Sequence, residues 1–211
     1  MERKTLYFVR HGESVYNKLN IIQGDVDPPL TKEGKDQAFE LGGYLLGFGI
    51  KQMAVSPLIR AKQTAEFINT VLNLPVSYYE DLREMYFGDW QGEMKIEHWD
   101  PFRRNFYEHG QPPPGGESKK EIIKRGEKCV LQICNDINEQ PVLVVSHGML
   151  VRLLIGEWFT NNTEKEIRAL RMPNLGVYKV EFEYDKKNLK PRKYEFLDLL
   201  GQSPEIKSKV L

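Results

Sequence analysis

Short apolar runs along the chain predict strands that are buried on both faces. Leu6–Val9, Met53–Val55 and Val142–Val145 contain no charged residue, which is typical of central strands covered by helices on both sides. A further short strand is predicted at Pro75–Tyr79. Apolar and charged residues alternate over Tyr178–Tyr184, and this period of two predicts a half-exposed strand near an edge of the sheet.

Helices are predicted between these strands from capping residues and from apolar spacings of three and four. Thr31 is the predicted N-cap of a helix over Lys32–Leu46, which ends at the glycines at positions 47 and 49. Ser56 is predicted to cap the next helix, with Pro57 at its first position. The apolar face of that helix is formed by Leu58, Ala61, Ala65, Ile68 and Leu72.

The second half of the chain predicts three more helices. Ser118 and Glu121 have the spacing of a capping box. The helix behind it carries an apolar face formed by Ile123, Gly126, Val130, Ile133 and Ile137. Met149–Phe159 predicts a helix packed behind the preceding strand. Thr163 marks the start of a short helix that runs to Leu170.

Strands that alternate with helices predict an α/β protein with three layers, an α/β/α sandwich. No repeat or linker divides the chain, so residues 1–211 are expected to form one domain. Residues 90–117 are expected to form a helical excursion, in which aromatic and charged residues mix before Pro112–Gly116 closes it. Two interpretations stay open: the excursion lies over a functional site, or it is a surface insertion whose aromatic side chains pack onto the domain. The polar tail Gln202–Leu211 is expected to fray.

Composition narrows the range of partners and locations. Lys+Arg and Asp+Glu both number 30, so the formal net charge of zero gives no support to binding of nucleic acid or of an anionic membrane. No stretch approaches the roughly 20 apolar residues of a membrane span. The apolar run after the charged residues 2–4 is too short for a signal peptide. We therefore expect a soluble, cytoplasmic protein.

The two cysteines, Cys129 and Cys134, fall within one predicted helix. Five residues apart, their side chains would point roughly 140° away from each other at about 100° per residue, so a disulfide between them is not expected. Neither their number nor their spacing indicates zinc, and no metal or cofactor is predicted. We expect two buried thiols in a reducing compartment.

Two histidines follow predicted strands in the same way. Arg10-His11-Gly12 comes directly after the first apolar run, and Ser146-His147-Gly148 directly after Val142–Val145. In an open α/β sheet, ligands bind beyond the carboxyl ends of the strands, so both histidines are candidates for one site. A single histidine at a strand end is commonly an ordinary hydrogen-bonded residue. The repetition, with an arginine beside one of the pair, favours an anion site that contains a nucleophile.

The residue types present fit phosphoryl transfer, which needs a nucleophile, cations and a proton donor. A neutral imidazole such as that of His11 attacks without a metal. Gly12 allows the chain to turn, so that Arg10 and His11 face one ligand. Arg60, in the first turn of a predicted helix, is a second candidate cation, although a solvated surface arginine explains it equally well. Glu84, on a predicted loop, is a candidate general acid, on weaker grounds because 30 acidic residues compete for that role.

Taken in order along the chain, these segments resemble the histidine phosphatase superfamily, which includes the phosphoglycerate-mutase-like proteins. The matches extend over nearly the whole length. They are Arg10-His11-Gly12-Glu13-Ser14 with Asn17, Gln23-Gly24, Pro29-Leu30-Thr31, Ser56-Pro57-Leu58-Ile59-Arg60-Ala61 with Gln63-Thr64-Ala65, Leu82-Arg83-Glu84 with Gly88, Trp90 and Gly92, Pro114-Gly115-Gly116-Glu117-Ser118, and Ser146-His147-Gly148.

The resemblance implies a role for each matching residue. His11 would be the nucleophile that becomes phosphorylated, and Arg10, Arg60 and His147 would hold the transferring phosphoryl group. Glu84 would protonate the leaving oxygen and then help to activate water. The pocket would also be lined by Asn17, Gln23, Gly24 and Gly148. The implied fold is an α/β/α sandwich around a mixed, mainly parallel sheet, and no metal is implied.

The superfamily contains both mutases and phosphatases, and this chain is more similar to the phosphatases. Met149 stands where mutases usually have asparagine, and Phe87 stands where they have tyrosine. The expected function is a phosphomonoesterase that acts on a small phosphorylated molecule through a phosphohistidine. A cofactor-dependent phosphoglycerate mutase is the first alternative. A catalytically silent protein that binds phosphate or a partner protein is the second.

The sequence leaves the substrate and the oligomeric state open. Arg103 and Arg104 in the excursion would reach a second anionic group of the substrate, or they are solvated on a helix. The aromatic residues around them would instead favour an apolar alcohol. A homodimer formed through an edge strand is one arrangement that the pattern allows.

Overall fold

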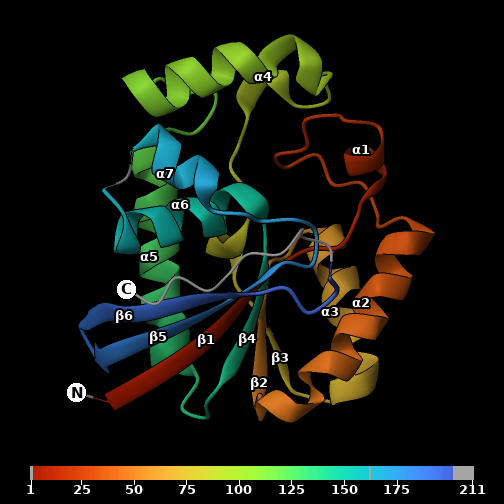
Figure 1. The fold of residues 1–211 in the computed structure, drawn as a ribbon, viewed down its shortest axis with the longest axis vertical. Helices are drawn as coiled ribbons and strands as arrows, with labels where there is room; N and C mark the ends of the chain where they lie inside the picture. Colours follow the sequence, from red (N-terminus) through yellow and green to blue (C-terminus); the bar gives the residue numbers. More distant parts are fainter. Residues whose placement is uncertain (1, 162, 202–211) are drawn as a thin grey trace.

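A six-stranded sheet forms the centre of the computed structural model, which describes residues 2–161 and 163–201 (Figure 1). The order across the sheet is β3-β2-β4-β1-β5-β6. The first four of these run parallel, while β5 pairs antiparallel with both β1 and β6. The predicted mixed, mainly parallel sheet is confirmed. The strands are β1 (Glu2–Arg10), β2 (Gln52–Val55), β3 (Val76–Tyr78), β4 (Val142–Ser146), β5 (Val177–Asp185) and β6 (Asn188–Leu197).

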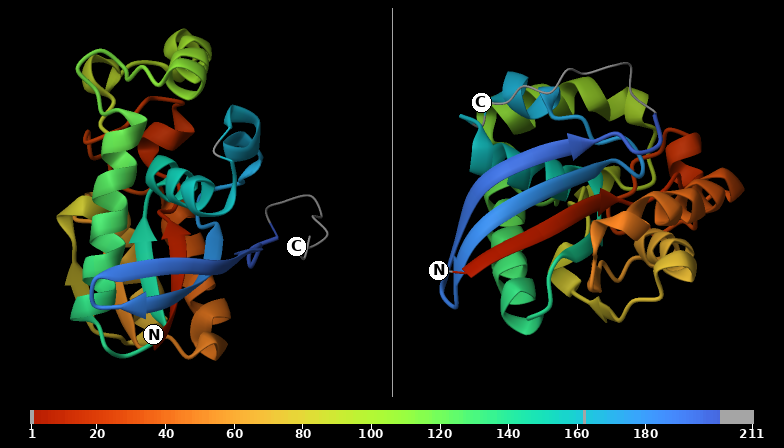
Figure 2. Two further views of the ribbon diagram at one scale, coloured as in Figure 1. Left: turned by 90° about the vertical axis from the view of Figure 1, so that its left-hand side faces the viewer. Right: turned by 60° about the horizontal axis from the view of Figure 1, so that its bottom comes forward.

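Helices cover both faces of the sheet, as the three-layer prediction requires (Figures 1 and 2). Along β1, Leu6 and Phe8 join the apolar core that contains α5 and α6 residues, whereas Tyr7 and Val9 join the core that contains α2 and α3 residues. The α-helices are α1 (Val15–Lys18), α2 (Lys32–Leu45), α3 (Ile59–Leu72), α4 (Lys95–Arg103), α5 (Lys119–Asp136), α6 (Gly148–Phe159) and α7 (Glu164–Ala169). Shorter helical turns lie at Leu46–Phe48, Glu80–Leu82 and Gly88–Trp90, and a π-helical turn at Arg104–Glu108.

Three of the four predicted helix caps are confirmed. Thr31 Oγ1 accepts from the Gly34 amide at 3.0 Å, and α2 ends in a short turn that closes at Gly49 in the left-handed region. Ser118 and Thr163 each form a capping box with the glutamate three residues later. Side-chain oxygens therefore satisfy amide donors at these starts that the helix itself leaves unpaired.

The prediction that Ser56 caps the third helix is wrong. The helix begins at Ile59, and Leu58 at its N-cap position contributes no side-chain hydrogen bond. Instead, Asp27 Oδ2 accepts from the Ile59 amide at 2.5 Å, although it lies on a loop 32 residues earlier in the chain. A carboxylate is favoured at a helix N-terminus. The Ser56 hydroxyl lies 2.7 Å from His147 Nε2, and its oxygen accepts from the amide of Leu58, the residue just before the helix, at 3.4 Å.

Strand β6 was not predicted from the sequence. It pairs with β5 alone and forms an edge of the sheet, and most of its side chains are exposed or half-buried. Pro191 lies opposite Phe182, where the register of the pair shifts. Proline is tolerated on an edge strand because its missing N–H faces solvent. Charges and a proline therefore obscured the alternation in this segment.

The excursion over residues 90–117 is helical, as predicted, with α4 at the top of Figure 1. Phe102 and Phe106 are buried in the core that also contains Phe87 and Met149, so its aromatic side chains do pack onto the domain. A position over the functional site stays a prediction. The fraying predicted for residues 202–211 concerns a segment outside the described residues. The side chains of Arg103 and Arg104 are likewise outside the described part of the structure.

Both cysteines lie on α5 as buried, free thiols, as predicted. Burial raises the pKa of Cys129 and of Cys134 to about 12. Among the described helices, none is long and apolar enough to cross a membrane.

Candidate active site

The sheet brings distant parts of the chain together at the carboxyl ends of its four parallel strands. Because β1 and β4 pair in register, Arg10 lies opposite Ser146, and the His11 amide donates to the Ser146 carbonyl at 2.9 Å. The β2–β4 register likewise places Val55 opposite Val145. Each strand leads to candidate site residues at this edge. Strand β3 is followed by the loop with Glu84, β2 by Ser56 and Arg60, and β4 by His147, while β1 ends at Arg10 and is followed by His11.

His11 is held as a neutral imidazole that bonds to the backbone through its Nδ1. Its Nδ1 lies 2.7 Å from the Gly12 carbonyl oxygen. Since a carbonyl only accepts, Nδ1 carries the proton and Nε2 keeps its lone pair. The side chain is 1% exposed, and burial, together with the charges of Arg60 and Arg10, lowers the pKa of His11 well below its ordinary 6.5. A neutral ring with a free lone pair is the form required of a nucleophile.

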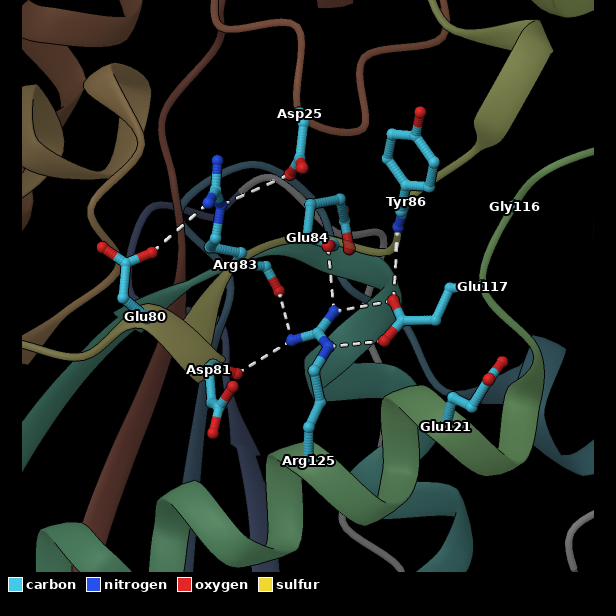
Figure 3. A pocket seen from close by; sticks show the side chains of 10 residues that line it. All are labelled: Asp25, Glu80, Asp81, Arg83, Glu84, Tyr86, Gly116, Glu117, Glu121 and Arg125. Atoms are coloured by element: carbon cyan, nitrogen blue, oxygen red, sulfur yellow. Dashed lines mark hydrogen bonds and ion pairs between the residues drawn. The ribbon is translucent and has the colours of Figure 1, made fainter.

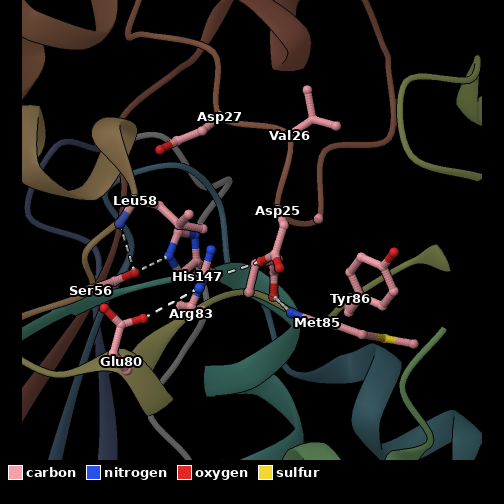
Figure 4. Close-up of polar contacts among 12 residues, drawn as sticks. Asp25, Val26, Asp27, Ser56, Leu58, Glu80, Arg83, Met85, Tyr86 and His147 are labelled. Atoms are coloured by element: carbon pink, nitrogen blue, oxygen red, sulfur yellow. Dashed lines mark hydrogen bonds and ion pairs between the residues drawn. The ribbon is translucent and has the colours of Figure 1, made fainter.

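His147 lies beside His11, with the two ring centroids 5.2 Å apart. Its Nε2 is 2.7 Å from Ser56 Oγ, a contact that Figure 4 shows. Burial, followed by the charge of Arg60, lowers the pKa of His147 well below 6.5. Its Nδ1 is buried and has no hydrogen-bond partner among the described residues. When the Ser56 hydroxyl donates to Nε2, that Nδ1 carries a proton available to a ligand.

Arg60 is completely buried, which excludes the solvated arginine that the sequence left open. Its guanidinium donates to the Gly24 carbonyl at 2.8 Å, to the Val26 carbonyl at 3.2 Å and to Asp27 Oδ1 at 3.2 Å. The loop over residues 24–27 therefore fixes the direction of this side chain. Burial lowers the pKa of Arg60, and the carboxylates of Glu84 and Asp27 oppose that effect.

Asp27 thus has two tasks, as the cap of α3 and as the partner of Arg60. We expect Asp27→Ala to lower the free energy of unfolding by about 1–3 kcal/mol, because a cap and a charge-assisted hydrogen bond are lost. It should also weaken binding of inorganic phosphate. Urea unfolding and calorimetry measure the two effects.

Two further variants make the Asp27 experiment specific. Asp27→Asn keeps one acceptor oxygen and should lie between the parent and the alanine variant in both measurements. Asp36→Ala removes a carboxylate that is 60% exposed, in a surface pair with Lys32, and should change neither. Unchanged stability and phosphate binding in Asp27→Ala would show that Arg60 does not depend on the Asp27 carboxylate.

Arg10 reaches the site from the last position of β1. Its NH1 donates to the Met172 carbonyl at 2.8 Å, and its Nε has no hydrogen-bond partner in the described part of the chain. A Cβ atom at Gly148 would lie 3.1 Å from Arg10 Nε, so the glycine permits this close approach. Desolvation lowers the pKa of Arg10 to about 10, and the Glu84 carboxylate opposes this shift.

The Glu84 carboxylate lies at the N-terminus of α6. Its Oε1 accepts from the amides of Met85 at 2.9 Å and of Met149 and Leu150 at 3.2 Å each. The positive end of a helix dipole favours a negative group at this position. The charge of Glu84 raises the pKa values of both Arg10 and Arg60, against the lowering effect of burial.

Asn17 and Gln23 are connected through Ser14. Asn17 Oδ1 accepts from the Ser14 amide at 3.2 Å, while the Ser14 hydroxyl donates to Gln23 Oε1 at 2.7 Å. Gly24 has a φ of +55°, which favours glycine, and it supplies the carbonyl that Arg60 binds. The structure therefore gathers all nine predicted site residues around the ends of β1, β2 and β4.

Two further residues of the site escaped the sequence analysis. The Asn174 amide group donates to the carbonyls of His11 at 2.9 Å and Gly12 at 3.0 Å, and so orients the carbonyl that fixes the His11 tautomer. The other is Lys95, the first residue of α4. Its pKa is lowered overall, because burial and the charge of Arg10 outweigh the opposing charge of Glu84. Only the antiparallel placement of β5 beside β1 brings Asn174 here, so no local signal in the sequence marks it.

Cationic and neutral nitrogen donors dominate the surroundings of His11. Arg10 Nε, Arg60 Nε and His147 Nδ1 are buried and without a hydrogen-bond partner among residues 2–161 and 163–201. An unsatisfied buried donor is costly, so donors of this kind indicate a ligand that accepts hydrogen bonds. Because two of the three side chains are arginines, that ligand is an anion.

One cluster of potential metal ligands occurs elsewhere in the described residues. Single donor atoms of Glu93, Glu97 and His98 lie within 4.8 Å of one another, near the start of the excursion. Both glutamates are exposed. The predicted site residues contribute nothing to this cluster.

Comparison with known proteins identifies the family. The model of the histidine phosphatase superfamily (branch 1) matches residues 6–193. The chain belongs to this superfamily. One of its relatives is the uncharacterized phosphatase PhoE of Bacillus subtilis, which is 32% identical over 182 residues, covering 86% of this chain and 90% of PhoE.

Another relative carries a different activity in its name. The probable phosphoglycerate mutase GpmB of Salmonella paratyphi B is 30% identical over 183 residues, covering 84% of this chain and 85% of GpmB. Among solved structures, the phosphoserine phosphatase of Entamoeba histolytica in complex with 3-phosphoglyceric acid has a TM-score of 0.74 at 25% identity, with coverage of 93% and 99%. The fold expected of a histidine phosphatase is confirmed. The relatives alone do not separate hydrolysis from isomerisation.

Proposed function

We propose that this histidine phosphatase is a phosphomonoesterase whose nucleophile is His11. The observation that carries the proposal is a neutral His11 whose protonated Nδ1 leaves the lone pair on Nε2, beside the buried Arg10 Nε, Arg60 Nε and His147 Nδ1, which have no partner in the described structure. Phosphoryl transfer depends on placing a nucleophile in line and on cations around the transferred oxygens. Arg10 and Arg60 supply the cations, and the neutral His147, whose ring centroid is 5.2 Å from that of His11, supplies a further N–H donor.

The reaction follows in two steps. In the first, Glu84 starts in its protonated form. His11 Nε2 forms a bond to phosphorus while the bond to the leaving oxygen breaks, and the Glu84 carboxyl group gives that oxygen its proton. In the second, Glu84 takes a proton from water as the water oxygen attacks the phosphohistidine, and phosphate leaves with Nε2 restored. Neither step consumes a cofactor, since Glu84 returns to its starting protonation state.

The surroundings of Met149 and Phe87 favour water as the acceptor. Both side chains are buried, at 5% and 4% exposure, in the apolar core beneath the excursion. The Phe87 ring lies 5.5 Å from that of Phe102, and Met149 Sδ accepts from the Tyr107 hydroxyl at 3.6 Å. Neither side chain offers a polar group to a phosphoglycerate hydroxyl. A site without such groups discriminates weakly among small monoesters.

Incubation with 3-phosphoglycerate tests this proposal. We expect release of free phosphate to exceed formation of 2-phosphoglycerate, because Met149 and Phe87 offer no polar contact that would hold the product for re-transfer. Both products are measured in one time course, with nitrophenyl phosphate as a general substrate. Efficient isomerisation with little phosphate released would show a mutase. Binding of phosphate without turnover of any monoester would show a silent binding protein.

Three further features belong to the same proposal. The substrate is a small phosphorylated molecule, in line with the phosphatase names of PhoE and of the Entamoeba protein. The chemistry is independent of metal, because His11 supplies the nucleophile and the arginines supply the positive charge. The protein acts in the cytoplasm, which suits two free thiols.

A further inference from the structure

Behind the loop that carries Glu84 lies a pocket of about 460 Å³ whose wall includes Arg125 and Glu117 (Figure 3). Arg125 projects from α5, and Glu117 lies just before that helix begins. Neither residue touches the predicted nucleophile or its cations in any contact described above. Their contacts are instead with the backbone on both sides of Glu84.

The Arg125 guanidinium uses all of its five N–H donors. NH1 donates to the carbonyls of Asp81 at 2.8 Å and Arg83 at 2.9 Å, and NH2 donates to the Glu84 carbonyl at 2.9 Å. The remaining two donors form a bidentate pair with Glu117, at 2.6 Å and 2.9 Å. Three carbonyls of one short loop are therefore fixed by a single planar group.

Glu117 completes the attachment on the other side of Glu84. Its Oε2 accepts from the Tyr86 amide at 3.3 Å, and its own amide donates to the Tyr86 carbonyl at 2.8 Å. The side chains of Arg125 and Glu117 are only 20% and 15% exposed, so solvent screens this pair less than a surface pair. The backbone from Asp81 to Tyr86 is thus held from the α5 side.

The opposite side of the loop is attached to the active site. Ser146 directly precedes His147 in the chain. Its hydroxyl donates to the Leu82 carbonyl at 2.8 Å. The Glu84 carboxylate itself accepts amides at the start of α6. The position of this carboxylate therefore depends on contacts from two directions, and Arg125 with Glu117 supplies one of them.

We propose that Arg125, with Glu117, is a positioning residue that sets the Glu84 carboxylate for proton transfer to the leaving oxygen. The inference rests on the proposed function. Lysine cannot replace the guanidinium, because an ammonium group has three donors and no planar fork. A displacement of about 1 Å at a proton donor is enough to cost roughly 100-fold in rate.

The test compares two substrates in Arg125→Lys and Arg125→Met. For an alkyl phosphate, whose leaving group needs a proton, we expect kcat/KM to fall by roughly 10–100-fold. For nitrophenyl phosphate the loss should be several-fold smaller. kcat/KM reports the steps up to departure of the alcohol, so the ratio of the two values isolates leaving-group protonation.

Arg168→Met is the matched control. Arg168 forms an exposed i,i+4 pair with Glu164 on α7, and its loss should leave the substrate ratio unchanged. A double variant, Arg125→Met with Glu84→Gln, shows whether Arg125 acts through Glu84. If it does, the double variant should have the same ratio of kcat/KM values for the two substrates as Glu84→Gln alone.

Several outcomes would overturn the inference while leaving the proposed function intact. One is an equal loss on both substrates in an active parent, which indicates a purely structural role for Arg125. Another is full additivity, in which Arg125→Met changes the ratio of the two kcat/KM values by the same factor in the Glu84→Gln protein as in the parent. If Arg125→Met fails to fold, Arg125→Lys and Glu117→Gln carry the same test. A parent that forms no phosphohistidine refutes the proposed function itself.

Discussion

Replacement of His11 by alanine is expected to abolish turnover, with a loss on the order of 10⁴–10⁶-fold, the scale seen when an enzymatic nucleophile is removed. The reason is that Nε2 holds the lone pair of a neutral ring whose pKa is lowered by burial and by the charges of Arg60 and Arg10. The parent should also form a covalent phosphoenzyme on mixing with substrate, and the variant should form none. Mass spectrometry of the quenched intact protein measures this adduct directly.

The fold should survive this substitution. The Gly12 carbonyl keeps the Asn174 amide as a donor when the imidazole is removed, so it is not left unsatisfied. An unfolding curve close to that of the parent therefore serves as the control. Turnover near the parent rate in a folded His11→Ala protein would exclude His11 as the nucleophile.

Glu84→Gln is expected to slow release of an alkyl alcohol by roughly 10²–10⁴-fold, the usual contribution of a general acid. Glutamine keeps an acceptor oxygen for the amides at the start of α6, but it has no acidic proton to give. Nitrophenolate leaves without help, so its ester should be affected far less. The measurement is kcat/KM for both substrates.

Glu80→Gln is the control for this second prediction. Glu80 precedes the same loop and pairs with Arg83 through a side chain that is 74% exposed. Its loss should change neither substrate. Equal losses for both esters in Glu84→Gln, with rapid labelling of His11, would assign Glu84 to hydrolysis of the phosphohistidine. Unchanged rates would remove Glu84 from the mechanism.

Local patterns predicted the elements whose causes are local. Val142–Val145 forms a strand because its side chains are buried on both faces, and Thr31 caps α2 through an amide three residues away. Short-range signals failed where the partner was distant. Ser56 followed by Pro57 has every local mark of a cap, yet Asp27 supplies that hydrogen bond. Tertiary contacts decide such competitions.

The same distinction applies to the site. His11 and His147 were found because each follows an apolar run, and parallel neighbours place such ends together. Asn174 belongs to a loop before an antiparallel strand, so its approach to His11 depends on the order of the strands and not on any motif. Glu84 was only a weak candidate from its predicted loop position, and the resemblance was needed to select it from the 30 acidic residues.

The buried cysteines give the molecule a native reporter of its own unfolding. Only the thiolate reacts with alkylating reagents, and burial raises the pKa of Cys129 and Cys134 to about 12. Both thiols lie on α5, the helix that also carries Arg125. We therefore expect alkylation at neutral pH to require an opening that exposes the buried thiols on α5. The labelling rate of each variant compares the integrity of this helix without any added probe.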